Sequence, residues 1–336
     1  MREPAFWWRA PGLASGLLAP AAMVYGAIAG ARMQRPGQDP GLPVLCIGNF
    51  TIGGAGKTPT ALAVGALLEA TGAKPVFLSR GYGGRLHGPL RVDPALHRAA
   101  DVGDEPLLLA RSRPTIVARD RVAGAALARE QGADMVVMDD GFQNPSLRKT
   151  CSLLVVDAGR GIGNGRVLPA GPLRAPLAPQ LARADALVVI GTGTGADDLM
   201  ARAGTLPVFR GRLAPDPAAL DLLQGAPLLA FAGIGDPEKF FATLRAAGLQ
   251  VGARRGFPDH HVYRAEEARA LLAEAERDGL TLVTTEKDLA RMAGVEALGP
   301  LSRRTRTLPV TLALDDAEGF RDFVLGRMGR VAAAPR

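Results

Sequence analysis

The sequence predicts an α/β protein in which helices flank a parallel sheet. Unbroken apolar runs of strand length recur along the chain and alternate with helical patterns, as in a sheet that is covered on both faces. The first run, 44–48, leads into a Gly-rich segment that opens a helix. With 336 residues, 47% of them hydrophobic, the chain is long enough for two domains with cores of their own.

The N-terminal part, 1–35, contains an apolar stretch at 13–31 that follows Trp7 and Trp8. Cleavage as a secretory signal would leave almost no leader before the first strand. The stretch is interrupted and rich in small residues, whereas a membrane span needs roughly 20 good apolar residues. We favour a helix that lies on a membrane surface, with both tryptophans at the level of the lipid head groups, over a spanning helix or a buried core helix.

A phosphate-binding loop is predicted at 51–58, which reads Thr51-Ile52-Gly53-Gly54-Ala55-Gly56-Lys57-Thr58. Backbone N–H groups of such a loop surround an anion, Lys57 reaches the outer phosphates and the Thr58 hydroxyl can hold Mg²⁺. Thr51 stands where the strict motif has its first glycine. The alternative is a tight Gly-rich turn without a ligand. The loop favours a P-loop NTPase-like fold that binds a nucleoside triphosphate together with Mg²⁺.

The other elements of the first domain follow in chain order. Further strands are expected at 75–79, 115–118, 135–139, 151–157 and 186–191, and helices at 57–71, 104–112 and 121–131. Ligands of such sheets bind at the carboxyl ends of the strands, where the phosphate-binding loop and the end of 135–139 would meet. The stretch 191–225 is rich in Gly, Ala, Pro and Asp, and we interpret most of it as a linker with a short strand near 207–212.

A second, smaller α/β domain is expected after this linker. Its elements are strands at 227–233, 281–284 and 308–314, and helices at 237–247, 265–277 and 316–328. We therefore divide the chain into an N-terminal hydrophobic helix, a P-loop domain, a linker, a C-terminal α/β domain and a disordered tail. Their bounds are 1–35, 36–205, 206–226, 227–328 and 329–336.

The chain is basic, with a formal net charge of +7 and a pI near 10. Arginines are scattered along the sequence, and aromatic residues make up only 5%. Single-stranded nucleic acid is usually bound by basic residues interleaved with stacking aromatics, so we expect no nucleic acid partner. An anionic substrate or an anionic membrane surface accounts for the same charge. We infer no protein partner.

Acidic residues follow the apolar run 135–139. Asp139 and Asp140 end this run and would emerge at the sheet edge that faces the phosphate-binding loop. Carboxylates at this place complete the magnesium site that Thr58 begins. The alternative is a pair of acidic residues that caps the turn at Gly141.

Three further polar residues are candidates for catalysis. Asp104 opens a predicted helix after Gly103, where it is equally well explained as an N-cap. His260 follows a carboxylate, an arrangement that suits proton transfer, although a solvated loop explains it as well. Arg174 ends a Gly/Pro-rich loop at 163–174 and can bind phosphate or lie on the surface.

Taken in order, eight motifs resemble those of the tetraacyldisaccharide 4′-kinase family, membrane-associated enzymes of lipid A synthesis. They are Gly48-Asn49 with 53–59, Ser79-Arg80-Gly81-Tyr82-Gly83-Gly84, Val102-Gly103-Asp104-Glu105-Pro106, Asp139-Asp140-Gly141-Phe142-Gln143, Gly163-Asn164-Gly165, 168–174, Asp259-His260 and Thr285-Glu286-Lys287-Asp288. The resemblance spans nearly the whole chain and makes 36–205 a kinase domain.

The resemblance implies an activity. It implies ATP- and Mg²⁺-dependent phosphorylation of the 4′-hydroxyl of a tetraacylated glucosamine disaccharide 1-phosphate, giving lipid IVA. It also implies a peripheral or monotopic place at the cytoplasmic face of the bacterial inner membrane. The partners expected from it are the acylated disaccharide phosphate and the inner-membrane surface. It leaves the role of 285–288 open.

The resemblance also implies roles for single residues. Asp104 matches the catalytic carboxylate and His260 its partner. The pair 139–140 matches the metal-side acidic pair, and Arg174 matches a phosphate-contacting arginine. Charge neutralisation by Lys57 agrees with these roles. Ala175 departs from the family, which often carries an acidic residue there.

A competing interpretation is a membrane-associated ATPase switch of the partitioning type. Those proteins place a lysine directly before the glycine pair. This chain has Ile52 there, which argues against a switch.

Overall fold

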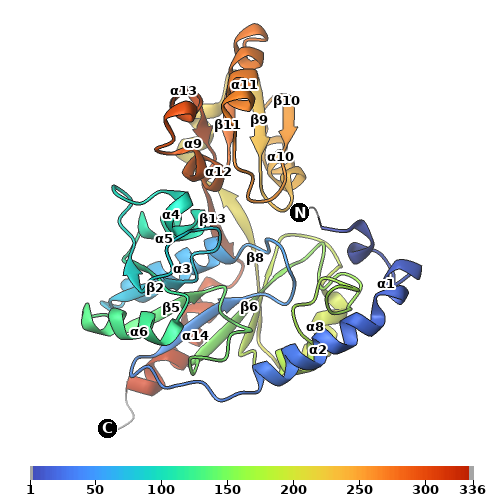
Figure 1. Cartoon of the computed structure of the whole chain (residues 1–336), viewed down its shortest axis with the longest axis vertical. Coiled ribbons are helices and arrows are strands. Elements are labelled where there is room, and N and C mark those ends of the chain that lie inside the picture. Colours follow the sequence, from blue (N-terminus) through green and yellow to red (C-terminus); the bar gives the residue numbers. More distant parts are fainter. Residues whose placement is uncertain (1–2, 333–336) are drawn as a thin grey trace.

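The computed structural model describes residues 3–332 and contains two sheets (Figure 1). The larger sheet has nine strands in the order β13-β8-β7-β6-β1-β5-β2-β4-β3. They are β1 (Val44–Gly48), β2 (Pro75–Ser79), β3 (Leu90–Arg91), β4 (Thr115–Val117), β5 (Met135–Asp139), β6 (Cys151–Asp157), β7 (Ala186–Ile190), β8 (Val208–Pro215) and β13 (Val310–Leu314). The predicted α/β class is confirmed.

The centre of the larger sheet is parallel and fully buried. β1 pairs in parallel with β5 and β6, and all five of its residues are buried. Only the terminal strands β3 and β13 run antiparallel to their neighbours. Helices cover the sheet, namely α3 (Lys57–Glu69), α4 (Ala99–Val102), α5 (Asp104–Ala110), α6 (Arg121–Glu130), α7 (Leu177–Leu181), α8 (Asp197–Ala203) and α14 (Ala317–Ala332). We call this sheet with its helices, together with α1 (Leu13–Leu17) and α2 (Ala19–Met33), the large unit.

The smaller sheet has four parallel strands in the order β10-β9-β11-β12. The strands are β9 (Leu228–Ala232), β10 (Val251–Gly256), β11 (Thr281–Thr284) and β12 (Arg306–Thr307). The helices around it are α9 (Pro217–Leu223), α10 (Pro237–Ala246), α11 (Ala265–Arg277), α12 (Glu286–Met292) and α13 (Gly299–Arg304). We call this part the small unit. The chain enters it after β8 and leaves it before β13, and in Figure 1 it stands above the large unit.

The structure corrects the prediction of a linker at 206–226. β8 lies in this range and pairs in parallel with β7 and antiparallel with β13. The segment 217–223 forms α9, which packs on the core of the small unit. The strand was hard to recognise as a full-length element because its pattern carries Arg210, Gly211 and Arg212 and most of its residues are partly exposed.

The last strand and helix also lie elsewhere than predicted. β13 joins the larger sheet, and Phe320 and Val324 of α14 pack in the same core as β1. A strand pattern shows that a segment is extended, but it does not show which sheet the segment joins. Of the predicted tail, 329–332 continue α14 and 333–336 lie outside the described residues.

The N-terminal helices α1 (Leu13–Leu17) and α2 (Ala19–Met33) lie along one side of the large unit (Figure 1). The buried face of α2 is built mainly from small residues, and a Cβ placed at Gly26 or Gly30 would lie 3.6 Å from Pro176. The larger apolar side chains point outward instead. They are Leu13, Leu17, Met23, Val24 and Ile28. Among the described residues, no helix has the length and apolar character needed to cross a membrane.

The expected position of the tryptophans is wrong for Trp7. This side chain is buried, and its indole nitrogen donates a 3.0 Å hydrogen bond to the carbonyl of Pro169. Trp8 donates to Glu3, and the Arg160 guanidinium lies over its ring. The segment before α1 therefore packs on the protein, because indole N–H groups find partners there.

Candidate active site

The predicted phosphate-binding loop joins β1 to α3 at the carboxyl end of the sheet. Gly53 and Gly56 have φ angles of 100° and 93°, which L-residues with a Cβ rarely adopt. Lys57 and Thr58, the first residues of α3, are buried. The Lys57 ammonium lies 3.5 Å from the carbonyl oxygen of Gly53 and 3.8 Å from Asp140 Oδ2. The loop thus holds its one lysine over its own backbone, where an anion would be bound.

Arg174 reaches this loop from the Gly/Pro-rich segment 163–174. Its Nε donates to the carbonyl of Thr51 at 2.8 Å, and its two terminal nitrogens donate to Asp140 at 2.7 and 3.1 Å. Burial raises the pKa of Asp140, but the charges of Lys57 and Arg174 outweigh it and lower this pKa to about 2. Both predicted cations therefore converge on one ionised carboxylate beside the loop.

Asp139 differs from its neighbour. It pairs in register with Ile47 of β1, it is almost fully buried, and neither carboxylate oxygen has a hydrogen-bond partner among the described residues. Burial, with the charges of Glu105 and Asp140, raises its pKa to about 7. An unpartnered buried carboxylate is costly unless a cation binds it. Carboxylate and hydroxyl oxygens are the ligands that Mg²⁺ prefers, so Asp139 and Thr58 fit this ion.

Asp104 is the first residue of α5, at the boundary between the two units. Gly103 precedes it with a φ of 91°, and no side chain caps this helix, so the N-cap explanation does not hold. The carboxylate is 4% exposed. Its Oδ2 accepts from Arg291 Nε at 2.7 Å and lies 3.5 Å from His260 Nδ1. Burial raises the pKa of Asp104, but the His260 hydrogen bond and the charge of Arg291 reverse this and hold it below its usual value.

His260 comes from the small unit, in the loop after β10. Its backbone N–H donates to the carbonyl of Gly233, and its φ is 54°. The hydrogen bond with Asp104 raises the pKa of His260, partly opposed by burial. The ring of Tyr82 lies 5.2 Å away by centroid, and the imidazole is about one-third exposed. The structure thus brings the predicted pair together from the two units.

Sequence reasoning missed the other contacts at this boundary. Lys287 of α12 donates to Glu105 at 2.6 Å, next to the contact between Arg291 and Asp104. Lys287 belongs to the motif at 285–288, whose role was left open, and Glu105 stands inside a quoted motif. Arg291 carried no sequence signal of its own, since it is one of 35 arginines.

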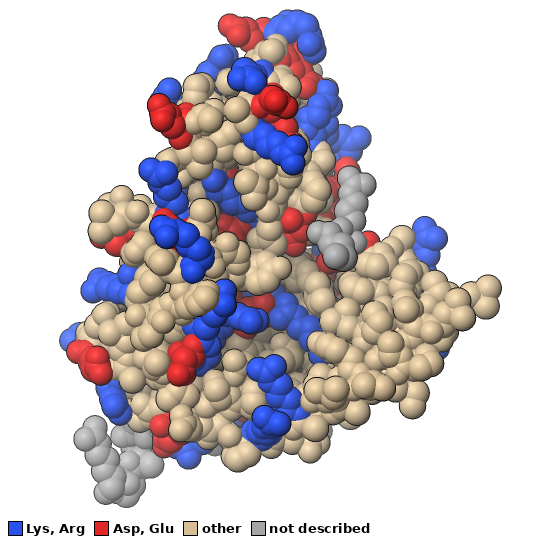
Figure 2. All heavy atoms as spheres, in the orientation of Figure 1, with Lys and Arg blue, Asp and Glu red and all other residues tan. Residues whose placement is uncertain are grey.

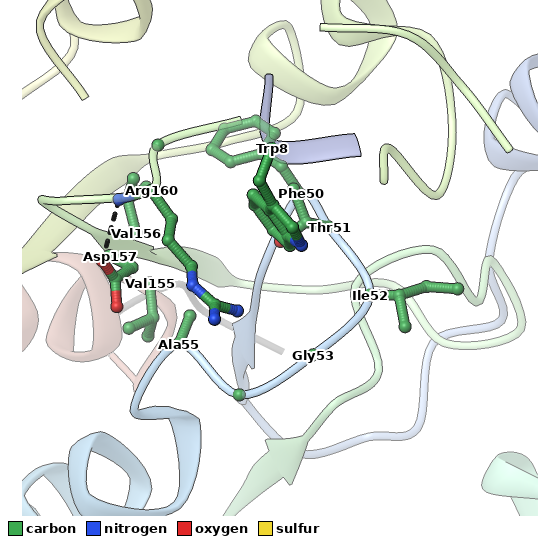
Figure 3. A pocket seen from close by; sticks show the side chains of 12 residues that line it. Trp8, Phe50, Thr51, Ile52, Gly53, Ala55, Val155, Val156, Asp157 and Arg160 are labelled. Atoms are coloured by element: carbon green, nitrogen blue, oxygen red, sulfur yellow. Dashed lines mark hydrogen bonds between the residues drawn. The ribbon is translucent and has the colours of Figure 1, made fainter. Parts of the chain in front are cut away.

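A second contact between the units lies beside the phosphate-binding loop. Arg160 forms ion pairs with Glu3 at 3.2 Å and with Asp236 of the small unit at 2.7 Å. Figure 3 shows its side chain extending toward the hollow beside Gly53 and Ala55, under Trp8. Lys239 of the small unit pairs with Asp157 nearby. Ion pairs thus join the two units here as well as at Asp104 and Glu105.

Comparison with known proteins identifies one family. Residues 14–329 match the model of the family described as Tetraacyldisaccharide-1-P 4′-kinase. A tetraacyldisaccharide 4′-kinase of Rhodopseudomonas palustris (strain BisA53) is 59% identical over 98% of this chain and 96% of the relative. The tetraacyldisaccharide 4′-kinase of Bradyrhizobium sp. (strain BTAi1 / ATCC BAA-1182) is 56% identical over 98% of this chain and 96% of the relative.

A solved structure is similar over most of the chain. It is described as the "apo" form of LpxK from Aquifex aeolicus in complex with ATP. Its sequence is 26% identical to this one, and the two structures superpose with a TM-score of 0.71. The superposition covers 94% of this chain and 100% of that one.

Proposed function

The chain belongs to the tetraacyldisaccharide-1-phosphate 4′-kinase family, and we propose how its residues divide the work of that reaction. It is a kinase of lipid A synthesis that uses ATP to phosphorylate the 4′-hydroxyl of a tetraacylated disaccharide 1-phosphate. The observation that carries our proposal is the meeting of Asp104 and His260 across the two units, next to Glu105, on whose carboxylate the charge of Lys57 in the phosphate-binding loop acts.

On the donor side, residues 51–58 surround the phosphates of ATP with backbone N–H groups. Lys57 and Arg174 already converge on Asp140, so both cations stand where charge builds up on the transferring phosphoryl oxygens. This arrangement needs no covalent participation by the protein, because phosphoryl transfer is promoted mainly by positioning and charge neutralisation.

The carboxylate of Asp139 and the hydroxyl of Thr58 would hold Mg²⁺, with Asp140 as the second predicted ligand. The unpartnered oxygens of Asp139 support this assignment. When bound, Mg²⁺ supplies positive charge that neutralises the phosphate oxygens.

On the acceptor side, Asp104 and His260 receive the proton of the sugar hydroxyl. Neighbouring cations keep Asp104 ionised at neutral pH, so it can accept a hydrogen bond from the hydroxyl and orient it. His260 shares the proton, since its contact with Asp104 favours the protonated imidazole. Because the two residues come from different units, the pair is complete only when the units are closed, which also excludes water from the phosphoryl group.

The outward face of α1 and α2 would bind the inner-membrane surface from the cytoplasmic side. Large apolar side chains point outward while small ones pack inward. On the right of Figure 2, where α1 and α2 lie, few side chains are charged. Contiguous exposed apolar surface of this kind is typical of membrane or protein interaction sites. A membrane surface would present the acylated substrate directly to the boundary between the units.

A vesicle-binding assay tests the membrane proposal. Leu17→Ser with Ile28→Ser should weaken binding to anionic phospholipid vesicles by roughly tenfold or more, since each large apolar side chain contributes on the order of 1.5–3 kcal/mol. Leu222→Ser is the matched control, because Leu222 and Ile28 are both 65% exposed. Equal vesicle binding by the double variant and the control would refute the proposal.

The reaction itself is tested with radiolabelled ATP, Mg²⁺ and the tetraacylated disaccharide 1-phosphate. Label should appear on the lipid, and a disaccharide that already carries a 4′-phosphate should take none. ATP hydrolysis that does not depend on the lipid, with no labelled lipid, would instead favour a nucleotide switch.

A further inference from the structure

The motif Thr285-Glu286-Lys287-Asp288 has no part in the function described so far. It begins α12 of the small unit, and the Thr285 hydroxyl accepts from the backbone N–H of Asp288 at 3.2 Å, which caps the helix. In Figure 1, α12 lies at the boundary with the large unit, close to α4 and α5. A motif that starts a helix at a unit boundary can fix how the two units dock.

Two ion pairs join α12 to the start of α5. Lys287 binds Glu105 at 2.6 Å, and Arg291 binds Asp104 through Nε at 2.7 Å. Positions four apart lie on one face of a helix, so a single face of α12 meets two adjacent carboxylates. One of those carboxylates is the proposed acceptor-side residue.

Arg291 is itself held rigidly. Its Nη1 donates to the carbonyl of Gly233 at 2.6 Å and to Asp288 Oδ1 at 2.8 Å. Asp288 is fully buried and also accepts from the Tyr263 hydroxyl and from the backbone N–H of Gly233. The carbonyl of Gly233 that Arg291 binds also accepts from the backbone N–H of His260. Arg291 therefore fixes Asp104 relative to the loop that carries His260.

We propose that Arg291 is a positioning residue of the acceptor side, which acts through Asp104. It orients the carboxylate toward His260 and keeps it ionised, and it does so only while the small unit is docked. This inference rests on the proposed role of Asp104. It assigns to 285–288 and α12 the task of coupling unit closure to the state of the acceptor-side carboxylate.

Removal of the Arg291 charge should shift the pH profile of kcat in one direction. Loss of the Arg291 charge removes a cation that stabilises ionised Asp104, so the pKa of Asp104 should rise. The same loss raises the pKa of His260, which Arg291 lowers. The reaction requires either Asp104 or His260 in its deprotonated form. In both cases the fall of kcat at low pH, the acidic limb of the pH profile, moves to higher pH. The charged groups around the pair are Arg291, Lys287, Glu105 and Asp259.

The test compares Arg291→Gln, Arg291→Lys and the surface control Arg254→Gln in the full-length enzyme. For Arg291→Gln we expect a kcat roughly 10²-fold lower, an acidic limb at higher pH and a nearly unchanged KM for ATP. Arg291→Lys keeps the charge but not the planar fork, so its acidic limb should stay in place while kcat falls less. Arg254 is exposed and contacts Glu238, so its variant should match the wild type.

Two outcomes would overturn the inference. One is a wild-type kcat and acidic limb in Arg291→Gln. The other is a folded Arg291→Lys variant whose kcat falls and whose acidic limb moves to higher pH. This second outcome can be observed even if Arg291→Gln does not fold. Asp104→Asn, measured in parallel, separates this inference from the proposed function. If Asp104→Asn is fully active, the role of Asp104 itself is wrong; if it is inactive while Arg291→Gln is normal, only the inference about Arg291 fails.

Discussion

The two sides of the proposed active site are built in different ways. The phosphate side is one continuous segment, residues 51–58, whose geometry follows from glycines and a helix start. The acceptor side combines three distant segments, with Asp104 of the large unit held by His260 and Arg291 of the small unit. Continuous sites keep their geometry through local backbone structure, whereas the acceptor side depends on how the units dock. Variants of the phosphate side should therefore lose activity because a charge is removed, and variants of the acceptor side because a group is no longer positioned.

Removal of the phosphate-side cation should have the largest effect. Lys57→Ala is expected to lower kcat by roughly 10³-fold or more, because the transferring phosphoryl oxygens lose a cation that is held against the loop. Lys74→Ala is the control, since Lys74 is an exposed lysine outside the site. Both variants should still unfold in one cooperative transition, with a lower Tm for Lys57→Ala, because Asp140 loses a cation that favours its ionised form. Near-normal phosphorylation by Lys57→Ala would remove the loop from the mechanism.

The acceptor side should respond more selectively. Asp104→Asn is expected to lower kcat by roughly 10²-fold while ATP affinity stays close to that of the wild type, because Asn cannot take a proton. ATP binding measured by calorimetry checks the second half of this expectation. If ATP affinity falls together with kcat, the two sides are not separate as described.

The buried carboxylate of Asp139 should lower the stability of the metal-free protein at neutral and higher pH. Its pKa is raised from 3.8 to about 7, so the folded state binds more protons than the unfolded state between these values. Stability from this group is therefore fully present below about pH 4 and is lost as pH rises through about 7. Without Mg²⁺, Asp139→Asn should raise Tm at pH 8 by roughly 2–5 °C relative to the wild type.

The metal titration completes this comparison. Mg²⁺ should raise the Tm of the wild type but have little effect on Asp139→Asn, since a ligand stabilises only the state that binds it. An unchanged response to Mg²⁺ in the variant would make Asp139 a structural residue at the end of β5.

The same contrast explains what the sequence could predict. The loop at 51–58 was recognisable because its signal lies in adjacent residues. The contact between Arg291 and Asp104 joins residues 187 positions apart, and no local pattern indicates it. β8 and β13 were misplaced for a related reason, because their partner strands, not their own patterns, decide which sheet they join. His260 was a candidate because it follows a carboxylate, but its pairing with Asp104 came only from the family resemblance, since a histidine beside a carboxylate is equally typical of a surface loop.

The central claim is that Asp104 and His260 act as one unit across the boundary between the large and small units. A double-variant cycle of Asp104→Asn and His260→Ala, with phosphorylation of the lipid disaccharide as the readout, tests it most directly. Each single variant should lower kcat, and the double variant should lose less than the product of the two single losses, because both residues act on one proton. Losses that multiply strictly would show that the two residues act independently, and would contradict the account.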